Sequence, residues 1–233
     1  NRISEPENLI KDKNGVYYID ENKKTLIKFK NNEIDIESFG IANEMLDDYF
    51  KDKNNVYYEN ELYKMGLKKI AGADRKSFKV LNDEFSRDKN NVYYYGNKMK
   101  GINPDGFEFV GRDFKNNEDI IYFLKTKDKV YVLKNKAGKE VYEIVPLNFD
   151  ANSFKYSNAD NSYESESAGY FQDKNGVYFL NGEKFVKING ADIDSFEVTM
   201  SGKYGKDRNN VYFEGKKMEG ENPKKFEEEM EIK

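Results

Sequence analysis

The residues best suited to chemistry in this chain are aspartates, asparagines and tyrosines that recur with a fixed local spacing. Asp12 and Asn14 form the D-x-N start typical of a calcium-binding loop, and equivalent pairs follow later in the chain. A calcium ion needs six or more oxygen ligands, but hydrophobic Val16 and Tyr17 stand where further ligands would be required. The D-x-N pair is therefore predicted to cap a tight turn, and calcium binding remains an alternative.

A second candidate is a set of tyrosines that occupy the same position in successive copies of the motif: Tyr17, Tyr57, Tyr93, Tyr178 and Tyr212. An exposed tyrosine combines a flat apolar ring with a hydroxyl group and suits contacts with protein, glycan or cell-wall polymer. The same rings are also candidates for packing between repeats, because 18 Tyr and 17 Phe supply most of the bulk for a core. We favour packing and keep these five tyrosines as candidate ligand-binding residues.

Carboxylates are the only conventional acid–base groups present in quantity, because the chain has no His and no Cys. Without His there is no Ser-His-Asp triad and no imidazole metal ligand. Two acidic clusters are candidates for paired-carboxylate hydrolysis: Asp160, Glu164 and Glu166, and Glu227, Glu228 and Glu229. Neither cluster has apolar neighbours that would bury a carboxyl group and raise its pKa. The sequence thus predicts a protein that is not an enzyme and that has no metal or cofactor site.

Charge and hydropathy narrow the range of partners. The chain has 39 basic and 43 acidic residues, a net charge of −4, and the two signs are interleaved. This pattern lacks the basic field that binds a phosphate backbone, so we expect no nucleic acid partner. No apolar run approaches the length needed to cross a bilayer, and no transmembrane segment is predicted.

The candidate residues belong to a repeat. A D-K-N-x-V-Y-Y-like run begins at five aspartates, and a shorter copy begins at Asp128, where two turn residues are missing. The six starts are Asp12, Asp52, Asp88, Asp128, Asp173 and Asp207. A second signature, in which Asp or Pro opens a short polar run that closes on Phe, keeps phase with the first. It ends at Phe39, Phe78, Phe107, Phe154, Phe196 and Phe226. The units, 34 to 45 residues apart, are predicted to form a single repeat array over residues 1–233.

Each unit is predicted to be a four-stranded antiparallel β-meander, and the second signature to be one helical turn capped by its first residue. In the third unit, strands are expected at 78–81, 84–87, 92–95 and 98–100. Alternation along a strand places Val16 and Tyr18 on one face and Tyr17 on the other. A single unit cannot bury such faces alone, so neighbouring units must cover them.

The fold class is therefore all-β, a tandem array of six antiparallel β-meander repeats. An open solenoid-like stack is favoured over a closed six-bladed propeller. In a propeller, an orphan strand over 226–233 would complete the first blade, although its acidic character also fits a helix. The stretch Asn158–Gly169 is polar and acidic and is predicted to be a surface loop, with a functional site there as the alternative.

The two phased signatures resemble those of the DKNYY repeat family, and the resemblance spans nearly the whole chain. It implies a bacterial protein that is secreted or lipid-anchored at the cell surface, and it supplies no catalytic residues. We expect a non-enzymatic extracytoplasmic repeat protein that acts as a binding or scaffold module for a protein or cell-envelope polysaccharide. The alternative is a structural spacer or stalk with no specific ligand.

Overall fold

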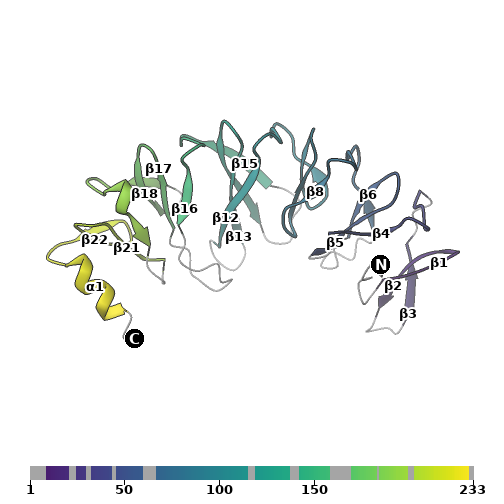
Figure 1. Cartoon of the computed structure of the whole chain (residues 1–233), viewed down its shortest axis with the longest axis horizontal. Coiled ribbons are helices and arrows are strands. Elements are labelled where there is room, and N and C mark those ends of the chain that lie inside the picture. Colours follow the sequence, from purple (N-terminus) through teal and green to yellow (C-terminus); the bar gives the residue numbers. More distant parts are fainter. Residues whose placement is uncertain are drawn as a thin grey trace. The chain divides into compact units, whose positions relative to one another are not determined.

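A computed structural model of the chain confirms the all-β repeat architecture (Figure 1). It describes residues 9–20, 25–29, 33–43, 46–59, 67–114, 119–136, 142–157, 169–182, 184–198 and 202–230. The described strands form six antiparallel sheets, and none of these sheets closes into a barrel. In each sheet the strands are hydrogen-bonded in chain order, which is the meander that the turn signals predict.

The chain divides into two compact units, Asn1–Phe107 and Glu108–Lys233. The first unit holds three sheets. They consist of β1 (Leu9–Asp12), β2 (Gly15–Asp20) and β3 (Thr25–Lys28); β4 (Gly40–Asn43), β5 (Leu46–Lys51), β6 (Val56–Tyr58) and β7 (Lys68–Lys69); and β8 (Lys79–Val80), β9 (Phe85–Arg87), β10 (Val92–Tyr94) and β11 (Asn97–Lys98). The prediction of one array across both units stays a prediction.

The second unit also holds three sheets, followed by a helix. The sheets consist of β12 (Glu108–Phe114), β13 (Asp119–Lys125), β14 (Val130–Lys136) and β15 (Tyr142–Leu147); β16 (Lys155–Ser157), β17 (Tyr170–Asp173), β18 (Gly176–Asn181) and β19 (Lys184–Lys187); and β20 (Glu197–Val198), β21 (Tyr204–Lys206), β22 (Val211–Phe213) and β23 (Lys216–Met218). The helix is α1 (Pro223–Met230).

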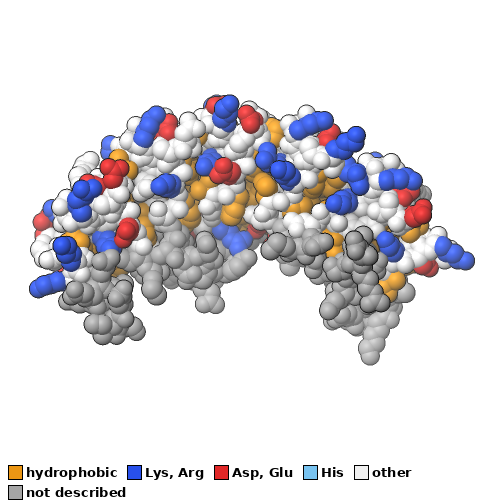
Figure 2. Space-filling model, viewed as in Figure 1, with side chains coloured by type: hydrophobic (Ala, Val, Ile, Leu, Met, Phe, Trp, Pro, Cys, Tyr) orange, Lys and Arg blue, Asp and Glu red, His pale blue; other side chains and the backbone are white. Residues whose placement is uncertain are grey.

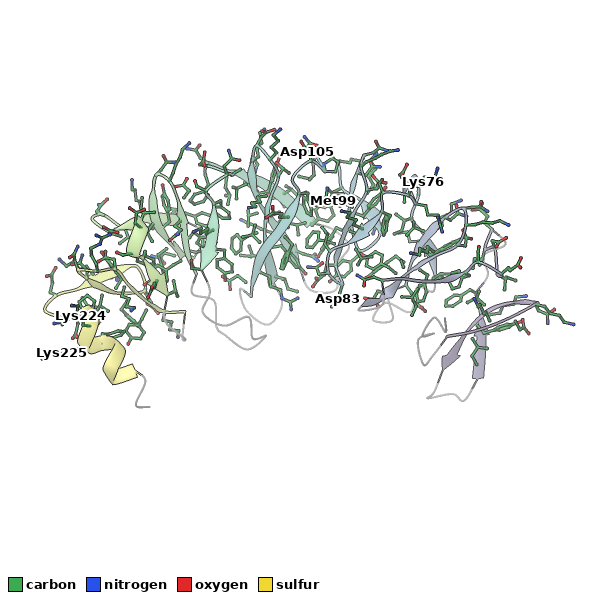
Figure 3. The ribbon with its side chains drawn as sticks, in the orientation of Figure 1. Lys76, Asp83, Met99, Asp105, Lys224 and Lys225 are labelled. Carbon is green, nitrogen blue, oxygen red and sulfur yellow. The ribbon has the colours of Figure 1, made fainter. Side chains whose placement is uncertain are left out.

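The second sheet is buried on both faces. Tyr57 and Tyr58 are adjacent in β6 and point to opposite faces, yet they are 0% and 4% exposed. Tyr57 packs with Val16 of the preceding sheet, and Tyr58 packs with Tyr93 of the following sheet. Side chains fill the space between neighbouring sheets of a unit (Figure 3). The alternating faces therefore do not separate core from solvent, as they do in a sheet with one wet face.

The core is largely aromatic, as the composition predicts. The largest fully buried side chains are all Tyr or Phe: Tyr49, Tyr57, Tyr93, Tyr94, Tyr122, Tyr170, Tyr212, Phe39, Phe50, Phe85, Phe123 and Phe171. Many of these rings meet in tilted or edge-to-face pairs, the arrangements that aromatic quadrupoles favour.

The fourth copy of the turn is not shortened, and the prediction that it starts at Asp128 is wrong. The Thr126 N–H donates to the Lys129 carbonyl at 2.8 Å, just as the Asp52 N–H donates to the Asn55 carbonyl at 3.1 Å. Lys125 also pairs with Val130 across a four-residue turn, as Lys51 pairs with Val56. Thr126 thus takes the place of Asp, and its hydroxyl accepts the Lys129 N–H at 3.2 Å.

The C-terminal segment is helical, so it supplies no orphan strand to complete a propeller blade. Pro223 is the first residue of α1, a position that its fixed φ angle suits, and the side chain of Asn222 accepts the N–H of Lys224 at 3.0 Å. The preference for an open stack over a closed propeller stays a prediction. In the described part of the chain, no helix has the length and apolar character needed to span a membrane.

Candidate functional site

The D-K-N-x run forms a turn that is held by its own aspartate. In the second copy, one carboxylate oxygen of Asp52 accepts the N–H groups of Asn54 and Asn55 at 2.7 and 2.6 Å. The same turn forms at Asp12, where Asn14 and Gly15 donate at 2.7 and 3.1 Å. This is the predicted turn-capping role, because Asp side chains satisfy backbone donors two and three residues ahead.

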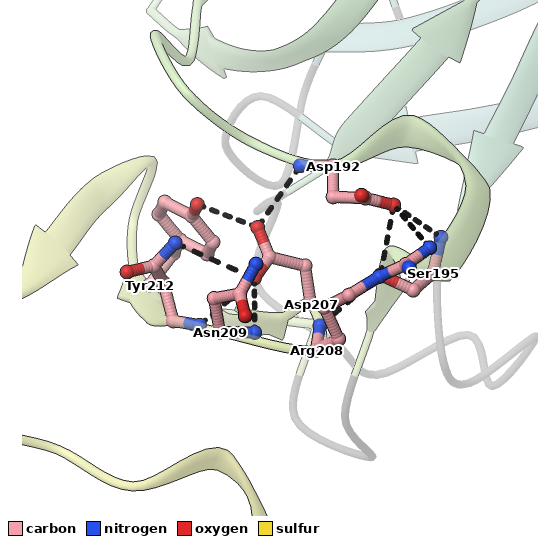
Figure 4. Close-up of polar contacts among 7 residues, drawn as sticks. Asp192, Ser195, Asp207, Arg208, Asn209 and Tyr212 are labelled. Carbon is pink, nitrogen blue, oxygen red and sulfur yellow. Dashed lines mark hydrogen bonds and ion pairs between the residues drawn. The ribbon is translucent and has the colours of Figure 1, made fainter.

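The second carboxylate oxygen links the two signatures. In four copies it accepts the backbone N–H of the aspartate that opens the D-x-x-S-F signature, at 2.7 to 3.0 Å. We call these pairs linked turns: Asp35 with Asp52, Asp74 with Asp88, Asp150 with Asp173, and Asp192 with Asp207. Figure 4 shows the last of them. Neither signature alone predicts this bond.

Each linked turn carries three further contacts. Ser38 accepts the Lys53 N–H at 2.9 Å through its hydroxyl oxygen, and the same hydroxyl donates to Asp35 at 2.7 Å. The Lys53 ammonium lies 2.6 Å from the Asp35 carboxylate. The other three linked turns repeat this ion pair as Lys89–Asp74, Lys174–Asp150 and Arg208–Asp192. The basic second residue of the motif is therefore engaged in pairing within the turn.

Both aspartates of the linked turn Asp35–Asp52 favour the ionised form. The Lys53 ammonium and then the Ser38 hydroxyl lower the pKa of Asp35 to about 2, and Lys89 does the same for Asp74. Burial opposes ionisation of Asp52, but the N–H of Asp35 and the hydroxyl of Tyr57 outweigh it, so the pKa of Asp52 also lies below its ordinary value. This linked turn is thus built around two carboxylates that are charged at neutral pH.

The lowered pKa values predict an acid-sensitive fold. A carboxylate with a lowered pKa stabilises the folded state above its ordinary pKa near 4, and this contribution is lost as the pH falls toward about 2. We expect the thermal unfolding midpoint, followed by circular dichroism, to fall steeply over that interval. Asp74→Asn should flatten the profile by removing one titrating group. A midpoint that is constant across this pH range would contradict the role given to these carboxylates.

The geometry of the linked turns disfavours calcium binding at D-x-N. Asp52 is fully buried, and its two carboxylate oxygens together accept four hydrogen bonds, from Asn54, Asn55, Asp35 and Tyr57. A cation there would have to displace these donors. Among the residues that the structure describes, no group of three or more acidic, His or Cys side chains is placed to hold a metal ion.

Three of the five candidate tyrosines are core residues, and their assignment to a binding surface is corrected. Tyr57, Tyr93 and Tyr212 are 0% exposed, and their hydroxyl groups donate to Asp52, Asp88 and Asp207 at 2.7 to 2.8 Å. Burial, and then the aspartate, raises the pKa of each tyrosine. These rings are covered because each packs in a core cluster with residues of the preceding sheet, so they cannot contact a ligand.

The fourth turn residue separates the buried tyrosines from the others. It is Asn in the three buried copies, and Asn55 and Asn91 donate to the hydroxyls of Tyr57 and Tyr93 at 3.1 Å. It is Gly in the copies of Tyr17 and Tyr178, which are only half-buried. The choice between N-N and N-G was the sequence signal that could have identified them.

Tyr17 and Tyr178 share a second feature, a lysine that crosses the turn. A Cβ placed on Gly15 would lie 2.6 Å from Cε of Lys28, and one on Gly176 would lie 2.6 Å from Cε of Lys187. The Lys28 ammonium lies 6.0 Å from the centroid of the Tyr17 ring. In each N-G copy the partly exposed tyrosine thus has a lysine as its cross-strand partner. These two copies lie in different units and are not shown to form one site.

The acidic clusters yield no described catalytic pair. Asp160, Glu164 and Glu166 lie outside the described residues, as does most of the stretch Asn158–Gly169. Glu227, Glu228 and Glu229 fall within α1, but their side chains are also outside the described part of the structure. The hydrolase alternative therefore stays a prediction.

Comparison with known proteins agrees with the repeat seen in the structure. The model of the DKNYY family matches residues 58–167 and 170–232, which include four of the six sheets and the last strand, β7, of a fifth. No curated protein and no solved structure matches the chain. The family match covers well over half of the sequence and includes three of the four linked turns, and the chain belongs to the DKNYY family.

Proposed function

We propose that this chain is a non-enzymatic repeat protein that acts as a binding or scaffold module for a protein or a cell-envelope polysaccharide. The proposal rests on a difference among residues at equivalent positions of the repeat. The recurring Asp, Ser, Lys and most Tyr residues are engaged in the linked turns, whereas Tyr17 and Tyr178 keep part of their rings exposed. Partly exposed tyrosines on a rigid frame are suited to recognition.

Surface charge supports a partner other than nucleic acid. Basic and acidic side chains are interspersed on the face that Figure 2 shows, and the net charge is −4. A phosphate backbone is bound by a cluster of basic charge, which this face lacks. An extracytoplasmic location, secreted or lipid-anchored, is part of the proposal and rests on the resemblance described above.

Tyr178 is the residue whose replacement tests this function most directly. It packs edge-on against Phe149 with ring centroids 4.9 Å apart, which fixes the ring while part of it stays exposed. We expect Tyr178→Ala to weaken binding by at least about tenfold in pull-downs from envelope extracts and on glycan arrays, as for an aromatic contact at the centre of an interface. Tyr17→Ala gives the same test in the other unit.

The matched control is Tyr57→Phe, which removes a buried hydroxyl at an equivalent position and should leave binding unchanged. Equal binding by the wild type and by both alanine variants would refute the tyrosine surface. If the wild type captures no partner in either assay, the chain is better described as a structural spacer or stalk.

A further inference from the structure

At one joint in each unit, the Phe of the second signature packs between one sheet and the next. Phe78 lies 6.0 Å from the Tyr49 ring of the preceding sheet and 5.9 Å from the Tyr93 ring of the following sheet. Phe196 lies in the same way between Tyr170 and Tyr212, at 5.2 and 5.8 Å. One ring wedged between two rings therefore occurs at an inter-sheet joint in both units.

In the last described sheet, the equivalent Phe makes the first of these two ring contacts. Phe226 in α1 lies 5.3 Å from the ring of Tyr204, which is the equivalent of Tyr49 and Tyr170 in its sheet. No second ring contacts Phe226 among the described residues. Phe213 is also 37% exposed, whereas its equivalents Tyr58, Tyr94 and Phe179 are 2 to 7% exposed.

The first described sheet presents the tyrosine position that the Phe contacts at the joints described above. Tyr17, the equivalent of Tyr93 and Tyr212, is half-buried and contacts no other ring in the described residues. Ile10, which pairs with Tyr17 across β1 and β2, is 41% exposed. The residues at that strand position in later sheets include Phe50, Ser86, Leu124 and Phe171, and all four are at most 1% exposed.

We propose that these two surfaces bind each other between copies of this chain. Phe226 and Phe213 of one copy pack against Tyr17 and Ile10 of a second copy, which continues the Phe-wedge joint across the contact. A second copy fits this surface for two reasons. It presents the Tyr17 ring, which would give Phe226 its second aromatic contact. It also presents Ile10, which stands at a strand position that is buried in later sheets. The contact joins two different surfaces, so each copy keeps one unused end, and the chains add head to tail.

The test blocks one end at a time. Ile10→Asp places a charge on the first sheet, and Phe213→Asp places one on the last sheet. We expect the mass of the wild type to rise with concentration in analytical ultracentrifugation, while each variant alone is at least about tenfold weaker in self-association. A mixture of the two variants should restore association but stop at two chains, because each then has one intact end that fits the other.

Val186→Asp is the matched control. Val186 is 49% exposed, but it lies in β19 of an inner sheet, so this variant should associate like the wild type. Tyr17→Ser and Phe226→Ser provide a second pair of end variants in case either charge prevents folding, which circular dichroism reports. A wild type that stays monomeric at every concentration overturns the proposal. So does an end variant that dimerises alone, or a mixture that does not associate.

Discussion

Replacing Tyr94 by Ala should lower the free energy of unfolding by about 3–5 kcal/mol, the usual cost of truncating a large buried aromatic side chain. Tyr94 is 2% exposed, and its ring centroid lies 5.0 Å from that of Phe85 and 4.5 Å from that of Tyr95. The truncation removes these contacts and leaves a cavity in the core. Urea denaturation followed by circular dichroism measures the loss.

The chain contains its own control for this variant. Phe213 occupies the same position in the last sheet but is 37% exposed, so Phe213→Ala should cost less than half as much. Both variants are compared at concentrations low enough to avoid association between copies. A loss well below 1 kcal/mol for Tyr94→Ala, or equal losses for the two variants, would show that burial at this position does not stabilise the fold.

The turn and the meander could be predicted from sequence because both depend on local chemistry. Asp12 and its equivalents cap backbone donors two and three residues away, and the strands on either side are rich in β-formers. The predicted start of the fourth turn at Asp128 is wrong because the first turn position in this copy is not Asp. Thr126 performs part of the same role with a hydroxyl group, and the turn keeps its four residues.

The burial of the candidate tyrosines could not be predicted by alternation along a strand. Alternation assigns Tyr57 and Tyr58 to opposite faces correctly, but it cannot tell whether the second face meets water or another sheet. Here neighbouring sheets cover both faces, so Tyr57 is as buried as Tyr58. Only the fourth turn residue, Asn or Gly, carried information about which tyrosines stay partly exposed.

The bond between the two signatures was also missed, because it joins a side chain to a backbone N–H group far away in sequence. Asp88 and Asp74 are 14 residues apart, and Asp173 and Asp150 are 23 apart, so spacing gave no guide. One feature of the sequence points to this bond, because both of its partners are lost together. The fourth turn has Thr126 in place of Asp, and the signature that precedes it, Asn103–Phe107, also lacks its opening Asp and its Ser.

Asp88→Ala tests the linked turn and should cost about 2–4 kcal/mol of unfolding free energy. The substitution leaves two buried donors, the Asn91 N–H and the Tyr93 hydroxyl, without their acceptor, and each such loss costs about 1–3 kcal/mol. Asp12→Ala is the control, since Asp12 caps an exposed turn and belongs to no linked turn among the described residues. It should cost about 1 kcal/mol, as for other capping side chains.

A double-mutant cycle with Tyr93→Phe separates the hydroxyl–carboxylate bond from the rest of the network. If the Tyr93 hydroxyl stabilises the turn mainly through Asp88, the two losses should be non-additive, with a coupling energy of about 1–2 kcal/mol in urea denaturation. Additive losses would mean that the hydroxyl finds another acceptor once Asp88 is removed. The burial of Tyr93 would then follow from ring packing alone, and the same would be expected of its equivalents Tyr57 and Tyr212, which make the same bond.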